Sequence, residues 1–193
     1  QYGNIRPLEY RTKVYSSRDF AKYKRDLKMM AEFFTEYNST MGYHIHVSFS
    51  EQRCYTQLFC RKFKESFLGD LRKYSETLTI KQRNKLLKRW SNPYCTNRYN
   101  KDYFDRIYNN TRYLAINYIS AWRAHRTVEF RIFPSSKSAQ ELINYTKWTL
   151  KFVENWLKNY RYDTKIQAEK DKQVLKKLIE SEADAAVIKK KIG

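Results

Sequence analysis

The chain has 193 residues, of which 41 % are hydrophobic, and its 39 Lys and Arg against 20 Asp and Glu give a net charge of +19. This length and composition suit one domain with a core rich in its 17 Tyr and 11 Phe, and the charge favours polyanionic partners such as nucleotides or nucleic acid. The absence of an apolar run of about 18 residues excludes a transmembrane helix, and three Cys without paired spacing predict free thiols in a reducing, cytoplasmic setting rather than a disulfide framework or a zinc site.

The first part of the sequence predicts strand, helix, strand and helix in that order. Each helix has apolar residues three or four positions apart, which is typical of a helix with one buried face. Ser16 or Ser17 can cap the first helix, and Gly69 follows the end of the second. The expected ranges are about 5–14, 17–37, 42–49 and 51–68.

The second part predicts a helix near Ile80–Trp90, strands over 111–119 and 126–133, and a further helix that begins at Ser138-Ala-Gln-Glu141, a capping box. After Asp163 the composition changes to Lys, Glu and Ala, which indicates a long charged helix. This order of elements predicts an α+β protein with helices on one side of a mixed or antiparallel sheet. We expect a core over residues 1–162 and a charged helical tail over 163–193.

Two strands carry polar side chains on one face. Successive side chains of a strand point to opposite faces, so His44, His46 and Ser48 share one face of the first strand, and Glu129 and Arg131 share one face of the second. Two imidazoles, a carboxylate and a guanidinium on a polar sheet face suit a divalent metal and a phosphorylated ligand.

Three motifs occur in a fixed order: G-Y-H-I-H-V-S at 42–48, R-Y-L-A-I-N-Y at 112–118 and T-V-E-F-R-I-F-P-S-S at 127–136. In this combination the chain resembles the amidoligase family, which is similar to glutamine synthetase and glutamate–cysteine ligase. The resemblance extends over about residues 5–160. It implies a glutamine synthetase-like catalytic core in which these motifs lie on a curved, mainly antiparallel sheet.

The resemblance also implies a reaction. ATP phosphorylates a carboxylate, and an amine then displaces phosphate from the acyl phosphate to form an amide. The implied cofactors are ATP and Mg²⁺, and the implied partners are the nucleotide and a small molecule or peptide with carboxylate and amine groups. A membrane is not an expected partner.

The resemblance implies a role for each matching residue. His44, Glu129 and Glu9 would be metal ligands, His46 would contact nucleotide phosphate or a second metal, and Arg131 would stabilise the transferred phosphoryl group. The residues implied to bind the cofactor or the substrate are Arg112, Asn117 and Ser48. The family begins with a strand that carries paired acidic residues, and nothing before Glu9 matches it. We therefore expect the chain either to lack that upstream strand or to be a non-catalytic relative.

Two other functions fit part of the sequence. A single-strand DNA nickase of the HUH type would use His44 and His46 to hold a metal and a tyrosine such as Tyr103, Tyr108 or Tyr145 as nucleophile. A basic, non-catalytic module would bind nucleic acid or a partner through charge and aromatic side chains.

Overall fold

The computed structural model describes residues 12–33, 41–90, 95, 114–118, 121 and 126–159. Within these ranges the protein is α+β, as predicted, with five α-helices and a three-stranded antiparallel sheet. The elements are η1 (Ser17–Asp19), α1 (Phe20–Phe33), β1 (Gly42–Val47), α2 (Gln52–Leu58), α3 (Arg61–Glu76), α4 (Ile80–Trp90), β2 (Ile116–Asn117), β3 (Val128–Pro134) and α7 (Ala139–Asn159).

The central strand of the sheet is β3, which pairs with β1 on one side and β2 on the other. The pairing with β1 is irregular: Tyr43 lies opposite Phe133, but Ile45 lies opposite Phe130. Two residues of β3, Arg131 and Ile132, therefore oppose the single residue His44. A bulge of this kind increases the local twist and redirects side chains, and it is common beside active sites.

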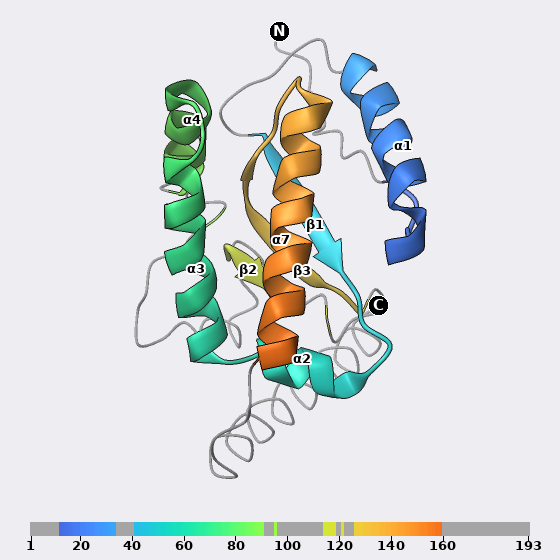
Figure 1. Ribbon diagram of the computed structural model, residues 1–193, viewed down its shortest axis with the longest axis vertical. Helices are drawn as coiled ribbons and strands as arrows, with labels where there is room; N and C mark the ends of the chain where they lie inside the picture. The colour runs from blue at the N-terminus through green and yellow to red at the C-terminus, as the bar shows by residue number, and fades with distance from the viewer. Residues whose placement is uncertain are drawn as a thin grey trace, which may run out of the picture.

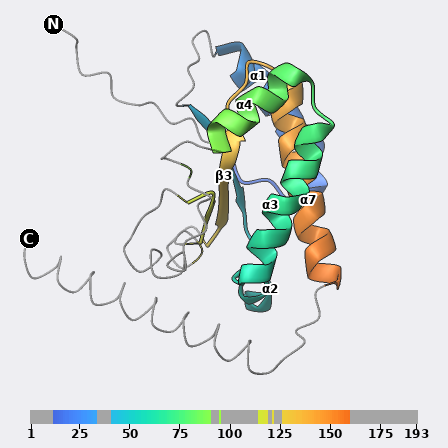
Figure 2. The ribbon, with the colours of Figure 1, turned by 90° about the vertical axis from the view of Figure 1, so that its left-hand side faces the viewer.

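Helices cover one face of this sheet (Figures 1 and 2). In Figure 1 α7 crosses in front of the strands, with α3 and α1 on its two sides. Figure 2 shows α3 and α7 together on the same side of β3. The predicted placement of helices on one face of an antiparallel sheet is therefore confirmed for the described elements.

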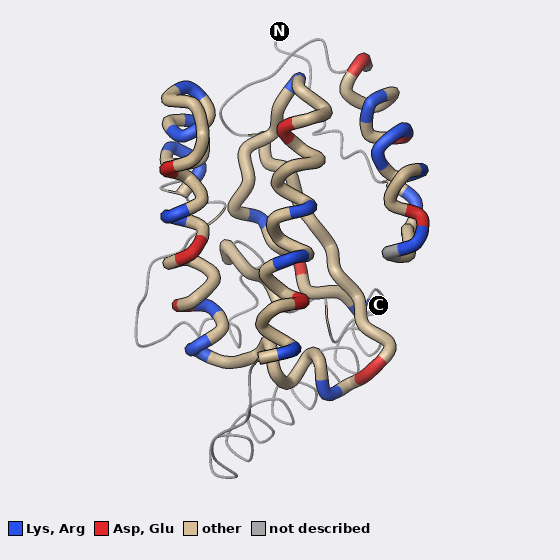
Figure 3. The backbone as a smooth tube through the Cα atoms, viewed as in Figure 1, with Lys and Arg blue, Asp and Glu red and all other residues tan. Residues whose placement is uncertain are grey.

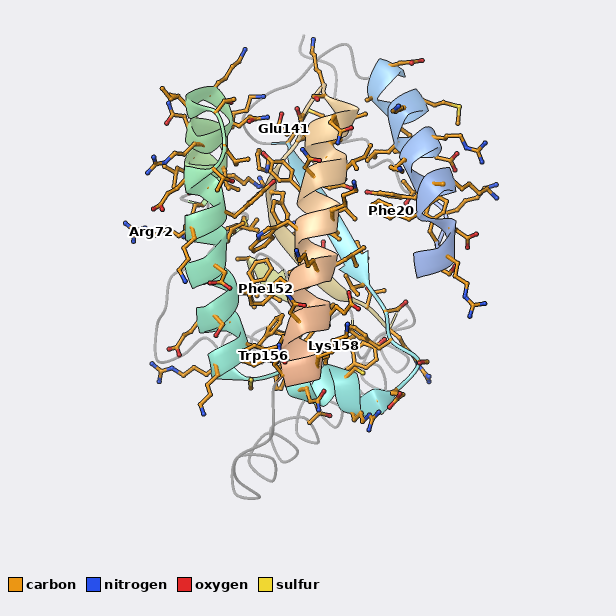
Figure 4. The ribbon with its side chains drawn as sticks, viewed as in Figure 1. Phe20, Arg72, Glu141, Phe152, Trp156 and Lys158 are labelled. Atoms are coloured by element: carbon orange, nitrogen blue, oxygen red, sulfur yellow. The ribbon has the colours of Figure 1, made fainter. Side chains whose placement is uncertain are left out.

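The core between the helices and the sheet is aromatic, as the composition predicts. Phe67 of α3 lies 5.0 Å from Phe130 of β3 and 5.3 Å from Phe152 of α7, measured between ring centroids. Phe63 adds a contact of 5.4 Å with Trp156, and Figure 4 shows Phe152 and Trp156 pointing from α7 toward α3. These rings fix α3 and α7 on the sheet.

Hydroxyl groups link α1 to the same assembly. The Thr146 Oγ1 of α7 lies 2.8 Å from the hydroxyl oxygens of both Tyr23 and Tyr43, which also bond to each other. Tyr23 and Leu27 are buried, so the predicted apolar stripe of this helix does face the core. The part of that predicted helix after Phe33 lies outside the described residues.

The prediction of one helix over 51–68 is wrong, because the chain forms two helices there. The break falls at Phe59 and Cys60, where Cys60 adopts an extended backbone and its Sγ accepts a hydrogen bond from the Phe63 amide. Gly69 does not follow a helix end but lies within α3. An apolar pattern continues through the break, so periodicity alone does not reveal it.

The two other predicted strands are described only in part. Of the strand predicted over 111–119 the structure describes residues 114–118, which contain β2. Residues 12–14 of the strand predicted over 5–14 are irregular, and residues 5–11 lie outside the described part. The helix over Ile80–Trp90 is confirmed at its predicted bounds as α4. The predicted tail helix lies outside the described residues.

The predicted capping box forms only in part. Ser138 Oγ accepts a hydrogen bond from the Glu141 amide at 3.3 Å, as a cap should. The Glu141 carboxylate instead accepts hydrogen bonds from Ser136 Oγ at 2.6 Å and from the Tyr145 hydroxyl at 2.7 Å, all three residues being buried. Glu141 therefore ties the segment after β3 to the start of α7.

The basic residues are spread over all the described helices rather than gathered at one end (Figure 3). Cys54, Cys60 and Cys95 are free thiols, as predicted. No helix in the described part of the chain is long and apolar enough to cross a membrane.

Candidate functional site

Glu129, on the central strand, is the centre of a cluster of polar side chains. Its side chain is only 6 % exposed, yet both carboxylate oxygens have partners. Oε1 accepts a hydrogen bond from Arg131 Nη1 at 2.6 Å and lies 3.0 Å from His44 Nδ1, while Oε2 accepts one from Asn117 Nδ2 at 2.8 Å. A buried carboxylate with this many donors is held in one orientation.

The register of the sheet explains why these residues meet. Glu129 on β3 lies directly opposite His46 on β1 and Asn117 on β2. Side chains directly opposite each other in neighbouring strands are within contact distance. The bulge then places Arg131 opposite His44, so two residues of β1, two of β3 and one of β2 converge.

His46 lies at the solvent side of the cluster. Its side chain is 42 % exposed, compared with 23 % for His44, and its Nε2 is 3.7 Å from Glu129 Oε1. Its other ring nitrogen lies 3.1 Å from Thr127 Oγ1, which orients the imidazole. The cluster thus runs from an accessible imidazole to a buried carboxylate.

The hydroxyl of Tyr55, on α2, holds the ends of the two polar strands together. It accepts a hydrogen bond from the Phe49 amide at 2.8 Å and donates one to the Arg126 carbonyl at 2.6 Å. Arg126 has a φ of 42°, in the left-handed region that non-glycine residues rarely adopt. This link fixes the chain just after β1 and just before β3, where His46 and Thr127 meet.

The charges around Glu129 lower its pKa. Burial by itself would raise the pKa of the carboxyl group, but the hydrogen bond from His44, the charges of Arg131 and His44 and the hydrogen bond from Asn117 outweigh it and hold the pKa at about 2. Glu129 is therefore ionised throughout the physiological range. A buried anion with fixed cationic neighbours is typical of a functional site.

Arg131 is anchored by one end of its guanidinium. Nη1 bonds to Glu129, but Nε is buried and has no hydrogen-bond partner among the described residues. Buried N–H groups in proteins are nearly always satisfied, so an unsatisfied one indicates a position for an acceptor from a ligand or water.

The sequence predicted five of the residues in this cluster: His44, His46, Asn117, Glu129 and Arg131. The prediction that His44 and Glu129 lie within reach of each other is confirmed by the 3.0 Å distance.

Three further residues were predicted for the site. Ser48 is exposed and follows the end of β1, on the same side of the alternation as His46, and it makes none of the contacts described above for the cluster. Glu9 and Arg112 lie outside the described residues.

Arg89 is a neighbour of the cluster that the sequence did not reveal. It lies in the last turn of α4, is 3 % exposed, and its Nε donates a hydrogen bond to the Arg131 carbonyl at 3.4 Å. In the sequence Arg89 is one of several basic residues of an amphipathic helix. The one sign that it is buried is its position three residues after Leu86, on the same face of the helix.

The donor set of the cluster fits Mg²⁺ only in the company of a nucleotide. Mg²⁺ is commonly bound through one or two carboxylates together with substrate phosphates and waters. Glu129 supplies one carboxylate, and His44 and His46 lie beside it. In the described part of the chain no group of three or more His, Cys, Asp or Glu is arranged to hold a metal by itself.

The proposed tyrosine nucleophile Tyr145 does not lie beside the histidines. Its ring stacks on Phe133 at 4.9 Å and its hydroxyl donates to Glu141 between α7 and the sheet, where the residue is fully buried. Tyr103 and Tyr108 lie outside the described residues. The arrangement therefore gives no support to a nickase.

A separate hollow of about 330 Å³ lies between α3 and α4, lined by Arg72, Ser75, Arg83, Leu87 and Trp90. None of these residues belongs to the cluster around Glu129. Figure 4 shows Arg72 pointing outward from α3, away from the sheet.

Comparison with known families gives one match. The model of the family described as "Putative amidoligase enzyme" matches residues 51–153, which is just over half of the chain and includes Asn117, Glu129 and Arg131. No curated protein and no solved structure gives a significant match. The matched segment begins just before α2 and ends within α7, and thus includes α3, α4 and the central strand β3 but not β1 with its two histidines. The chain belongs to this amidoligase family, as its motifs predicted, and the family description indicates an enzyme of the ligase kind.

Proposed function

We propose that the protein is an ATP-dependent carboxylate–amine ligase that forms an amide through an acyl phosphate. The observation that carries the proposal is the convergence of His44, His46, Glu129 and Arg131 on one face of the sheet. It is the face opposite to that of Phe130, whose ring packs on Phe67 of α3. The chain's membership of an amidoligase family supports the same reaction class.

The reaction has two steps. An oxygen of the substrate carboxylate forms a bond to the γ-phosphorus of ATP, and the bond from that phosphorus to the β,γ-bridging oxygen breaks, so ADP leaves. The amine nitrogen then bonds to the carbonyl carbon of the acyl phosphate, phosphate leaves with the oxygen it received, and the amine loses a proton. Both steps need positioning and charge stabilisation rather than a protein nucleophile.

Arg131 is suited to stabilise the phosphoryl group during transfer. Glu129 holds one end of its guanidinium at 2.6 Å, so the cation is fixed before the substrate binds. The buried Nε–H of Arg131 is available to a ligand oxygen, because it has no partner within the described ranges. Fixed cations of this kind match phosphate oxygens well.

Glu129 and His44 are the residues that would hold Mg²⁺ delivered with ATP, and His46 is accessible to the nucleotide phosphates at the solvent side. Glu9 would add a further carboxylate. When bound, the ion would neutralise charge on the β- and γ-phosphates. Asn117 contributes by orienting the Glu129 carboxylate through its hydrogen bond to Oε2.

The test is turnover with mixtures of candidate substrates. The chain is incubated with Mg²⁺, ATP, a pool of amino-acid carboxylates and hydroxylamine as amine, and both ADP and hydroxamate are measured. We expect ADP release that requires both acid and amine. Arg131→Met should reduce it by about 100-fold to 1,000-fold, the typical effect of removing one stabilising donor.

Arg25→Met is the matched control, because Arg25 is exposed on α1 and the substitution removes the same charge. It should leave turnover within a factor of two or so of the unmodified chain. Failure of the chain to bind Mg·ATP or to release ADP with any pool would contradict the proposal, and so would wild-type turnover by Arg131→Met.

A further inference from the structure

The hollow between α3 and α4 has a lining that is partly cationic and partly apolar. Two residues of α3, Arg72 and Ser75, face three residues of α4, namely Arg83, Leu87 and Trp90. The spacings of three and four residues place the contributions of each helix on one face of that helix. Figure 2 shows that α4 follows α3 in space and runs from it toward β3, so the hollow lies where the chain turns from one helix into the other.

Burial defines an inner end and a mouth. Ser75 is only 1 % exposed and lies at the inner end, whereas Arg72 and Arg83 are exposed at the mouth. The Ser75 hydroxyl already donates a hydrogen bond to the Arg72 carbonyl at 2.6 Å. Leu87 is 40 % exposed and is among the exposed large hydrophobic residues of the described chain, and Trp90 is half-buried. A molecule in the hollow would therefore meet apolar walls inside and guanidinium donors at the mouth.

The positive charge at the mouth is not neutralised by the described part of the chain. Neither Arg72 nor Arg83 has a side-chain hydrogen bond or ion pair with another described residue. Helix α4 contains five basic residues and no acidic one. On α3, Asp70 pairs with Lys73 instead, and Glu76 makes no ion pair with Arg72 within the described ranges. Two guanidinium groups with donors to spare suit the oxygens of a carboxylate or a phosphate.

We propose that this hollow binds a small organic anion, in which a carboxylate or phosphate group is attached to a single apolar ring. The ring would pack on Leu87 and the indole of Trp90, and the anionic group would bind Arg72 and Arg83 at the mouth. The volume of about 330 Å³ is near the lower end of the range for ligand pockets, about 300–1,000 Å³, so it suits one ring better than a nucleoside triphosphate.

The inference goes beyond the proposed function and does not rest on it, because no lining residue belongs to the cluster around Glu129. Two simpler descriptions of the hollow make different predictions. A basic surface without a site would bind every small anion alike, and a crevice that only water fills would bind none. Probes that separate the ring from the anionic group distinguish all three descriptions.

The experiment follows the indole N–H signal of Trp90 in ¹H–¹⁵N spectra of the full chain at constant ionic strength. The chain has four Trp, and Trp90→Phe identifies the signal. Phenyl phosphate and phenylacetate are the two ring-bearing anions, inorganic phosphate lacks the ring, and benzyl alcohol lacks the charge. We expect at least one of the two ring-bearing anions to bind with a dissociation constant below about 1 mM, and inorganic phosphate and benzyl alcohol to bind at least about tenfold more weakly.

Arg72→Met and Arg83→Met should each weaken the binding by about tenfold, because each removes a charge-assisted contact at an exposed position. Lys88→Met is the matched control, since Lys88 is exposed on α4 and does not line the hollow; it should change the affinity less than about twofold. Unchanged affinity in both arginine variants would overturn the inference. So would equal affinity for inorganic phosphate, or no shift of the Trp90 signal with either ring-bearing anion at about 10 mM.

Discussion

Replacement of Glu129 by Gln tests whether the ionised carboxylate organises the cluster. Gln has the same shape as the protonated carboxyl group, so the variant removes the charge and leaves Arg131 and His44 in place. The pKa of Glu129 is lowered from 4.5 to about 2 in the fold, which corresponds to about 3 kcal/mol in favour of the ionised form at pH 7. Removal of one partner from a buried ion pair costs a similar amount, about 3–5 kcal/mol.

The effect also has a defined dependence on pH. Because the pKa in the folded state lies below that of the unfolded chain, the stabilisation is complete above about pH 4.5 and is lost as the pH falls toward 2. We expect Glu129→Gln to lower the free energy of unfolding by about 3 kcal/mol at pH 7 and by about 2 kcal/mol at pH 3.5. Urea denaturation followed by tryptophan fluorescence at several pH values measures this difference.

Glu65→Gln is the control for this experiment. Glu65 forms an exposed ion pair with Arg61 at 3.0 Å, so its replacement should change the free energy of unfolding by no more than about 0.5 kcal/mol. Equal stability of Glu129→Gln and the unmodified chain at pH 7, or a difference that does not shrink between pH 4.5 and 3.5, would refute the account of Glu129 as a buried ionised group.

Three further substitutions test the scaffold, each by urea denaturation. Tyr55→Phe should lower the free energy of unfolding by about 1–3 kcal/mol, because the Phe49 amide loses its acceptor. The control is Tyr74→Phe, which should be near neutral because the Tyr74 hydroxyl makes no hydrogen bond among the described residues. Equal losses of stability in the two variants would argue against the Tyr55 link. Gly69→Ala should stabilise the fold by about 0.5–1 kcal/mol because Gly69 is exposed within α3 and nothing lies within 4 Å of the added Cβ; a destabilised variant would contradict the helix assignment there. Phe67→Ala should lower the free energy of unfolding by about 3–5 kcal/mol, since Phe67 is fully buried among aromatic rings. A loss of stability below about 1 kcal/mol would show that Phe67 is not in the core.

The cluster could be predicted from the sequence because alternation in strands is a simple rule. His44, His46, Glu129 and Arg131 each lie two residues from another member, so each pair lies on one strand face whatever the rest of the fold does. Alternation does not indicate that the two strands lie in the same sheet. That expectation came from the motifs shared with the amidoligase family.

Other features depend on three-dimensional contacts that no local pattern records. The break between α2 and α3 follows from the cap that Cys60 provides, although the apolar spacing on both sides is continuous. Arg89 looks like the exposed basic residues of α4 and differs only in what it contacts. The bulge at Arg131 and Ile132 likewise becomes visible only when the strands are paired.

Transfer of a carboxylate oxygen to phosphate tests the proposed ligase reaction most directly. The chain is given Mg²⁺, ATP, hydroxylamine and a pool of amino acids labelled with ¹⁸O in their carboxylates, and the released phosphate is analysed by mass spectrometry. An acyl-phosphate mechanism predicts phosphate that carries one ¹⁸O, in amounts that fall with Arg131→Met. Release of ADP with unlabelled phosphate would mean that water attacks ATP directly, and it would contradict the account.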